Sequence, residues 1–210
     1  MRIAFSGKIC SGKTTAANIV ESMLGCEATT KLSVASRVKE LAIDLFGMEQ
    51  KDRKLLQVLG QKMKEIDPDV WIRALIKQVN DCGDKHIVID DLRFPNELRA
   101  LRENGFIIIR LEIDPELQLK RIKETYPDTW ESHVSRLDNI SETALDRRVQ
   151  TSCRSAWRSH PELRSASKVP SAAPPYNCEN FDYVIHQPDT ETIRNYFKDL
   201  IAHENKNVRP

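Results

Sequence analysis

The chain begins with residues whose types and spacing suit the binding of phosphate groups. Gly7 and Gly12 are followed at once by Lys13 and Thr14, in the pattern Gly-x-x-x-x-Gly-Lys-Thr. In such a loop the glycines let successive backbone N–H groups point inward at an anion, and the next helix directs the positive end of its dipole there. The lysine then reaches the outer phosphates of a nucleoside triphosphate, and the threonine hydroxyl reaches Mg2+.

The sequence around this loop supplies the strand and the helix that the motif requires. Ile3 to Phe5 form a short apolar run before the loop, and residues 15–24 carry apolar side chains at helical spacing. The alternative, a glycine-rich turn that merely joins a strand to a helix, does not need the lysine and threonine. The residues expected to bind ATP are Gly7, Lys8, Cys10, Ser11, Gly12, Lys13, Thr14 and Thr15.

A second group of reactive side chains follows a buried strand near residues 86–90. Asp90, Asp91 and Arg93 come directly after its apolar residues. Ligands of open α/β sheets bind at the carboxyl ends of the strands, so Asp91 is expected to hold Mg2+ directly or through water. Arg93 is expected to bind a substrate phosphate with its planar guanidinium, with a surface ion pair as the weaker alternative. Asp90 is expected instead to accept hydrogen bonds from nearby backbone N–H groups.

The pattern of apolar segments predicts an α/β protein with one domain over residues 1–210. Strands are expected at 2–6, about 29–34, 86–90, 106–113 and 182–186, with helices between them. Such alternation is typical of a parallel sheet with helices on both faces. Three helices are expected to start at Pro68, Pro95 and Pro115, because proline at the first helical position loses no needed hydrogen bond.

Composition excludes several classes of partner. The 210 residues have a formal net charge of +1, so the sequence indicates no attraction to nucleic acid or to a membrane surface. No apolar run approaches the length of a membrane span and no signal peptide is recognised, so we expect a soluble cytoplasmic protein. The five cysteines are scattered and are expected to be reduced. Cys10 is expected to be oxidisable at its helix N-terminus, but not catalytic.

The regular pattern ends between Asp146 and Asn180, where the sequence is rich in serine, proline and arginine. We interpret residues 147–180 as a long insertion or a mobile lid. A basic segment of this kind could face transferred phosphates when a lid closes, or it could be a solvated surface.

Several segments together resemble the deoxynucleoside monophosphate kinases of bacteriophages and some large viruses. The most specific is Asp91-Leu-Arg-Phe-Pro-Asn-Glu97. The others are the phosphate loop, Ser33-Val-Ala-Ser-Arg-Val-Lys-Glu40, Leu55-Leu-Gln-Val-Leu-Gly60, Asp67-Pro-Asp-Val-Trp71, Ile140-Ser-Glu-Thr-Ala-Leu-Asp146 and Phe181-Asp-Tyr-Val-Ile185. The stretch at 147–180 is longer than expected for this family. The sequence therefore does not define the boundaries of the lid, and it does not decide whether this stretch forms an oligomer contact, for example in a homodimer.

The resemblance implies a P-loop NTPase three-layer fold with a five-stranded parallel sheet flanked by helices. It implies a helical substrate-binding region at about 35–80 and a lid at about 115–150. The implied reaction transfers the γ-phosphoryl group of ATP, with Mg2+, to a deoxynucleoside monophosphate, in the host cytoplasm if the source is a virus. By motif match, the resemblance implies that the residues at the site of phosphoryl transfer are Lys13, Thr14, Asp91 and Arg93. Candidates for the acceptor pocket and lid are Lys39, Arg53, Gln57, Trp71, Glu97, Arg121, Ser141 and Glu142.

No paired histidine and carboxylate is recognisable near these motifs, which fits the implied reaction. The second pKa of a monophosphate is near 6, so the attacking oxygen is already ionised and catalysis reduces to alignment and charge neutralisation. Arg121 is the leading lid arginine for that task, with a solvated helix residue as the alternative. Trp71 could stack on the acceptor base or belong to the core.

Two other functions remain open from the sequence. A phosphomevalonate kinase has a similar phosphate loop and also phosphorylates a phosphate. A nonenzymatic sensor could bind ATP to position its lid for a partner.

Overall fold

The computed structural model of the chain describes residues 1–146, 181–187 and 189–207. Within them, five strands form one sheet in the order β2-β3-β1-β4-β5, and every pairing is parallel. The strands are β1 (Arg2–Gly7), β2 (Thr29–Leu32), β3 (His86–Leu92), β4 (Ile107–Glu112) and β5 (Tyr183–His186). The predicted parallel five-stranded sheet is therefore confirmed. Strand β2 ends earlier than predicted, because the Ser33 side chain caps the next helix.

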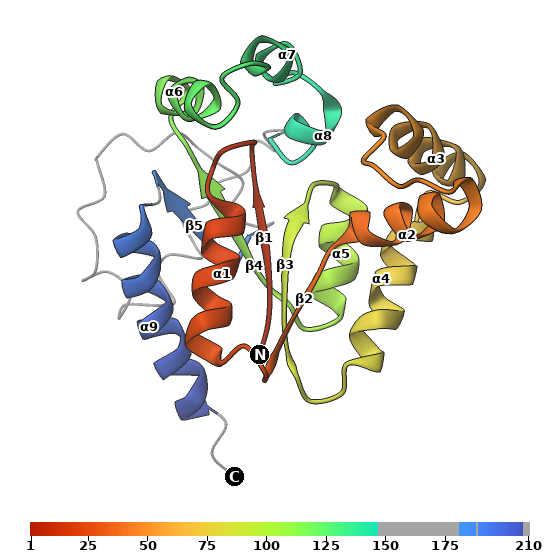
Figure 1. Ribbon diagram of the computed structural model, residues 1–210. Helices are drawn as coiled ribbons and strands as arrows, with labels where there is room; N and C mark the ends of the chain where they lie inside the picture. The colour runs from red at the N-terminus through yellow and green to blue at the C-terminus, as the bar shows by residue number, and fades with distance from the viewer. Residues whose placement is uncertain (147–180, 188, 208–210) are drawn as a thin grey trace.

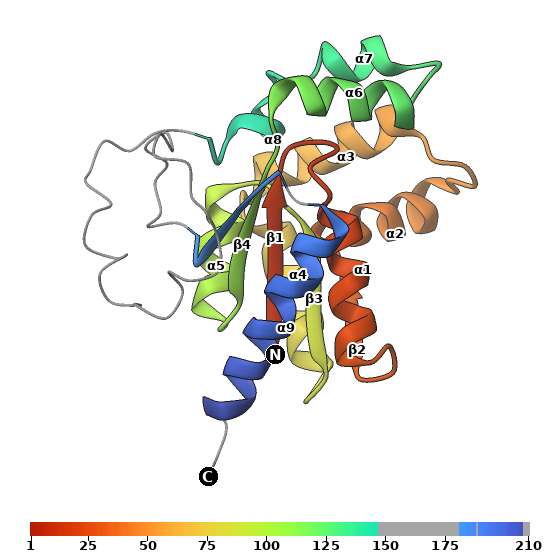
Figure 2. The same cartoon turned by 90° about the vertical axis from the view of Figure 1, so that its left-hand side faces the viewer.

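Helices cover both faces of the sheet, which makes three layers (Figures 1 and 2). Ile3 and Phe5 of β1 pack with α1 (Lys13–Leu24) and α9 (Thr190–Asn207) on one face. Ala4, between them, belongs to the core on the other face, which α4 (Val70–Asp81) and α5 (Pro95–Glu103) cover. Alternate residues of a strand point to opposite faces, so β1 is apolar on both. The P-loop NTPase three-layer fold is confirmed.

Two groups of further helices flank the sheet. Helix α2 (Val34–Phe46) packs on α3 (Arg53–Ile66) and α4, in the region where a substrate-binding part was predicted. The helices α6 (Pro115–Thr125), α7 (Trp130–Val134) and α8 (Ile140–Thr143) lie over the carboxyl ends of the strands, at the top of Figure 1. Within the described residues, no helix is both long and apolar enough to cross a membrane.

Two of the three predicted proline helix starts are confirmed. Pro95 and Pro115 are the first residues of α5 and α6. Pro68 differs, because α4 begins two residues later at Val70. The side chain of Asp69 caps no N–H of this helix and instead accepts a hydrogen bond from Asn96 Nδ2 at 2.7 Å. This contact ties the start of α4 to the start of α5.

Candidate active site

The loop between β1 and α1 has the backbone conformation of a phosphate cradle. Gly7, Cys10 and Gly12 have positive φ angles of 153°, 61° and 95°. A Cβ atom on Gly7 would lie 2.4 Å from Ser11 Oγ and 2.6 Å from the Leu111 carbonyl oxygen, so a side chain has no room there. The chain can therefore turn tightly at the end of β1 and bring its N–H groups together at the start of α1.

Lys13 is buried at the first position of α1. Its Nζ donates hydrogen bonds to the carbonyl oxygens of Gly7 and Lys8, each at 2.7 Å. Burial and the nearby Arg93 lower the pKa of Lys13 to about 8. The ammonium group of Lys13 therefore lies inside the loop, where it is affected by a second cation, the Arg93 guanidinium at the end of β3.

The two carboxylates near the carboxyl end of β3 lie differently from the sequence-based expectation. Asp90 Oδ2 accepts a hydrogen bond of 2.7 Å from Thr14 Oγ1, at the exposed first turn of α1 where Thr15 is also exposed. Asp91 instead accepts bonds from Ser33 Oγ at 2.6 Å and from the N–H groups of Val34 and Ala35 at 3.0 Å. Asp91 thus holds the start of α2, and Asp90 is the carboxylate beside the threonine hydroxyl. Asp90 therefore bonds to a side-chain hydroxyl and not to backbone N–H groups as expected, whereas Asp91, the residue expected to hold Mg2+, accepts hydrogen bonds at the start of α2.

Arg93 lies directly after β3 and faces the phosphate loop. Its guanidinium Nη1 forms an ion pair with Glu142 Oε1, and Glu142 Oε2 accepts a hydrogen bond of 2.7 Å from the N–H of Ile9 in the loop. Glu97 is buried, and its Oε2 accepts from the N–H groups of Arg93 and Phe94, each at 3.0 Å. Burial raises the pKa of Glu97. Glu97 therefore fixes the backbone that carries Arg93, and does not line an acceptor pocket as the resemblance suggested.

Helix α6 contacts the phosphate loop through two side chains on one face. Arg121 Nη1 donates to the Cys10 carbonyl oxygen at 3.3 Å, and Gln118 Nε2 donates to the Ile9 carbonyl oxygen at 2.9 Å. Arg121 therefore lies at the loop, as a lid arginine would. Gln118 is buried, and sequence reasoning missed it; its spacing of three residues from Arg121 was the available signal. Burial raises the pKa of the Cys10 thiol, so the structure gives no support for the expected ease of oxidation.

A buried arginine that the sequence analysis missed lies beside the loop. Arg110 of β4 donates to Ser6 Oγ at 3.1 Å and forms an ion pair with Asp146. Asp146 also pairs with Lys8 of the loop at 3.0 Å. A charged residue within the apolar run of β4 was the signal that could have identified it.

Among the described residues a histidine does pair with a carboxylate, contrary to the sequence-based expectation. His186 Nδ1 lies 3.3 Å from Glu112 Oε2, where β5 and β4 end. The other charged groups that act on the Glu112 carboxylate are Arg110, Asp146 and Lys8.

The other acceptor candidates are not gathered at one place. Trp71 is 3% exposed, and its indole Nε1 donates to the Gly60 carbonyl oxygen at 3.1 Å, so Trp71 is a core residue and not a base-stacking one. Lys39 and Gln57 are exposed on α2 and α3, and the hydrogen bonds of the described residues join neither to the phosphate loop. Ser141 contacts Asn139 through its backbone N–H at 3.2 Å. The side chain of Arg53 and the whole 147–180 insertion lie outside the described residues.

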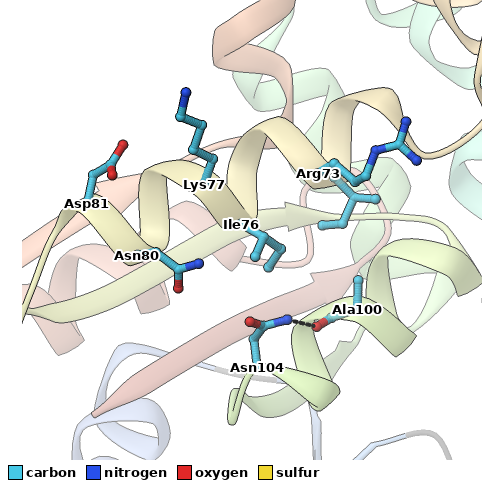
Figure 3. Close-up of a pocket in the computed structure, with 8 residues that line it drawn as sticks. Arg73, Ile76, Lys77, Asn80, Asp81, Ala100 and Asn104 are labelled. Atoms are coloured by element: carbon cyan, nitrogen blue, oxygen red, sulfur yellow. Dashed lines mark hydrogen bonds between the residues drawn. The ribbon is translucent and has the colours of Figure 1, made fainter.

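A shallow groove lies elsewhere, between α4 and the end of α5 (Figure 3). Ile76, Ala100 and the side chain of Asn104, which donates to the Ala100 carbonyl oxygen at 2.8 Å, line part of it. None of the site residues predicted from the sequence lines this groove. The candidate active site is therefore the phosphate loop with the ends of β3 and β4 and the helices α6 and α8.

Comparisons with known proteins agree with this fold. An uncharacterized protein, ORF77, from Ictalurid herpesvirus 1 (strain Auburn) is 27% identical over an alignment of 159 residues, and the match covers 71% of this chain and 68% of that protein. An uncharacterized protein from Eubacterium ventriosum ATCC 27560 has a similar fold, with a TM-score of 0.53, 11% identity and coverage of 96% and 98% of the two chains. The structure of TT1252 from Thermus thermophilus is also similar, with a TM-score of 0.51, 15% sequence identity and coverage of 97% of each chain.

The family comparison includes the phosphate loop and β3. Residues 3–133 match the family described as an AAA domain, which is more than half of the chain. The match runs from β1 through the loop to helices α6 and α7. The chain belongs to this AAA domain family.

Proposed function

We propose that the protein transfers the γ-phosphoryl group of ATP to a deoxynucleoside monophosphate. The observation that carries the proposal is the position of Arg93, whose guanidinium pairs with Glu142, the carboxylate that also accepts a hydrogen bond of 2.7 Å from the N–H of Ile9 in the phosphate loop. Lys13 and the loop N–H groups suit the triphosphate, whereas Arg93 comes from the end of a different strand. A guanidinium there suits the phosphate of a second substrate, because it can form two parallel hydrogen bonds to phosphate oxygens.

The residues around Thr14 fit a magnesium ion. Its hydroxyl and the Asp90 carboxylate, 2.7 Å apart, are hard oxygen donors of the kind that Mg2+ prefers. Mg2+ is usually held by one or two protein oxygens together with substrate phosphates, so a larger cluster of acidic side chains is not required. When bound, the ion would neutralise charge on the β- and γ-phosphates. Thr14 and Asp90 are the residues that would hold it.

The transfer itself needs alignment and charge, and no dedicated base. The acceptor phosphate is ionised near neutral pH, because its second pKa is near 6. Lys13, Arg93 and Arg121 supply positive charge around the place where the phosphoryl group would move. Helices α6 and α8 lie over that place and would exclude water, which would otherwise hydrolyse ATP.

The choice of a nucleotide acceptor depends on the resemblance of the Asp91–Glu97 segment to deoxynucleoside monophosphate kinases. Trp71 gives it no support, because this side chain is in the core. A phosphomevalonate kinase therefore remains the rival enzyme. A nonenzymatic ATP sensor is disfavoured by the position of Arg93, since binding ATP alone does not require a second phosphate site.

A panel of acceptors tests the proposal. The protein is incubated with ATP, Mg2+ and either dTMP, dGMP, dCMP or phosphomevalonate, and the products are separated and identified. We expect a deoxynucleoside diphosphate, and no product from Lys13→Ala. Product from phosphomevalonate alone would establish the rival enzyme, and saturable ATP binding without any product would establish the sensor. Arg93→Ala should raise the KM of the acceptor far more than the Kd of ATP.

A further inference from the structure

The Glu142 carboxylate joins the two halves of the candidate active site. One oxygen accepts the N–H of Ile9 in the phosphate loop at 2.7 Å, and the other forms the ion pair with Arg93. The side chain of Glu142 is 10% exposed, whereas that of Arg93 is 35% exposed. The same carboxylate therefore fixes where the arginine lies relative to the loop.

The segment that carries Glu142 is itself anchored. Leu145 packs against the core on the α4 and α5 face of the sheet. Asp146 pairs with the buried Arg110 and with Lys8, the latter at 3.0 Å. The N–H of Glu142 donates to the Asn139 carbonyl oxygen at 2.9 Å. Contacts on both sides of Glu142 thus hold its backbone near the loop, where Figure 1 shows α8 over the ends of β1 and β3.

Charge explains why Arg93 needs this partner. Lys13 and Arg93 are like charges, and Arg93 is the largest electrostatic contribution that lowers the pKa of Lys13. Glu142 acts in the opposite direction on the same lysine. Without the carboxylate, the long and flexible side chain of Arg93 would be repelled from the loop and would turn toward solvent.

We propose that Glu142 is a positioning residue that acts through Arg93, holding its guanidinium beside the phosphate loop so that it can receive the acceptor phosphate. This inference rests on the proposed function. Glu142 itself touches neither substrate in this role. Its two oxygens are used by Ile9 and Arg93, and the other guanidinium N–H groups of Arg93 remain to bind phosphate.

A different role for the same contact would have a different consequence. If the carboxylate occupied the place of a phosphate and had to leave before ATP bound, its removal would tighten ATP binding. The anchoring of Leu145 and Asp146 favours a fixed position, because departure of Glu142 would also disturb a partly buried ion pair and a core contact.

A double-mutant cycle tests the positioning role. Glu142→Ala, Arg93→Ala and the double variant are compared with the unaltered protein by the kcat and KM for the acceptor found in the panel and by the Kd of ATP. We expect Glu142→Ala to lower kcat/KM for the acceptor by about 10- to 100-fold, with the Kd of ATP changed by less than about threefold. The double variant should be no more than about threefold worse than Arg93→Ala, because both changes remove one interaction.

Two further variants keep the test interpretable. Glu142→Gln preserves the length of the side chain, but its amide oxygen can accept well from only one of the two partners. This variant should therefore lose less kcat/KM for the acceptor than Glu142→Ala does. It replaces Glu142→Ala in the test if the alanine variant does not fold. Glu131→Gln, an exposed carboxylate on α7, should leave every constant unchanged.

Other results would overturn the inference. Additive losses in the cycle would show that Glu142 does not act through Arg93. A lower Kd of ATP in Glu142→Ala with an unchanged acceptor KM would establish the displaced carboxylate instead. If the unaltered protein phosphorylates no acceptor, the proposed function and this inference both fall, whereas an active protein with an additive cycle removes this inference alone.

Discussion

Substitutions of Asp90 and Asp91, the two neighbouring carboxylates near the end of β3, should separate an effect on stability from an effect on Mg2+ dependence. Asp91 accepts three hydrogen bonds at the start of α2, from Ser33 Oγ and the N–H groups of Val34 and Ala35. Asp90 accepts one, from the exposed Thr14 hydroxyl. Replacing each by alanine therefore removes very different sets of contacts.

The expected magnitudes follow from those contacts. Losing a helix cap costs about 0.5–2 kcal/mol and bonds to a charged acceptor are worth about 1.5–3 kcal/mol each, without being additive. Asp91→Ala should thus lower the free energy of unfolding by about 3 kcal/mol, which in a chain of this size lowers Tm by roughly 6–12 °C. Asp90→Ala should cost less than about 1 kcal/mol, or roughly 3 °C.

The assay pairs thermal unfolding with the transfer rate at increasing Mg2+ concentration. Asp90→Ala should raise the Mg2+ concentration for half-maximal rate at least about tenfold, since tenfold in an equilibrium constant is about 1.4 kcal/mol. Asp91→Ala, assayed well below its Tm, should keep the Mg2+ dependence of the unaltered protein. The reverse result, with Mg2+ dependence lost in Asp91→Ala and retained in Asp90→Ala, would refute the assignment.

Three further predictions concern single residues. Because the pKa of Lys13 is lowered to about 8, this lysine becomes neutral above that pH, so the Kd of ATP should rise by up to about tenfold per pH unit above 8. Lys13→Arg should remove that rise if it binds ATP, and a flat profile in the unaltered protein would contradict the argument. Gly7→Ala should destabilise by about 2–4 kcal/mol through its contacts with Ser11 and Leu111, measured by denaturant unfolding, whereas Gly105→Ala, with positive φ and open space, should cost about 1 kcal/mol. Trp71→Phe should lose about 1–2 kcal/mol of stability with its bond to Gly60 and leave the acceptor KM unchanged; a large rise in KM would restore the stacking role.

The phosphate loop and the sheet could be predicted because their signals are local. The glycine spacing before Lys13 and the apolar runs of the strands lie within short segments, and each requires a particular backbone conformation. Even the edge strand β5 was placed correctly, although a long segment without a regular pattern precedes it.

The roles of Asp90 and Asp91 could not be assigned in the same way. Neighbouring residues of a strand point to opposite faces, so one of them must face α1 and the other α2. Strand β3 is apolar on both faces, and its pattern does not indicate which face each helix covers.

The charged contacts around the loop depend on segments that are far apart in the sequence. Arg110 and Asp146 are separated by 36 residues, and Ile9 and Glu142 by 133. Glu142 was a candidate only through the family resemblance. Arg110 could have been noticed as a charged residue within the otherwise apolar strand β4. Their partners become evident once the fold brings α8 to the loop.

Transfer of a labelled phosphoryl group tests the central claim most directly. The protein is given ATP labelled at the γ-phosphate, Mg2+ and a mixture of deoxynucleoside monophosphates, and the labelled products are separated. We predict that the label moves into a deoxynucleoside diphosphate, and that Lys13→Ala abolishes this transfer. Label that remains in ATP, or that appears as inorganic phosphate alone, would contradict the account.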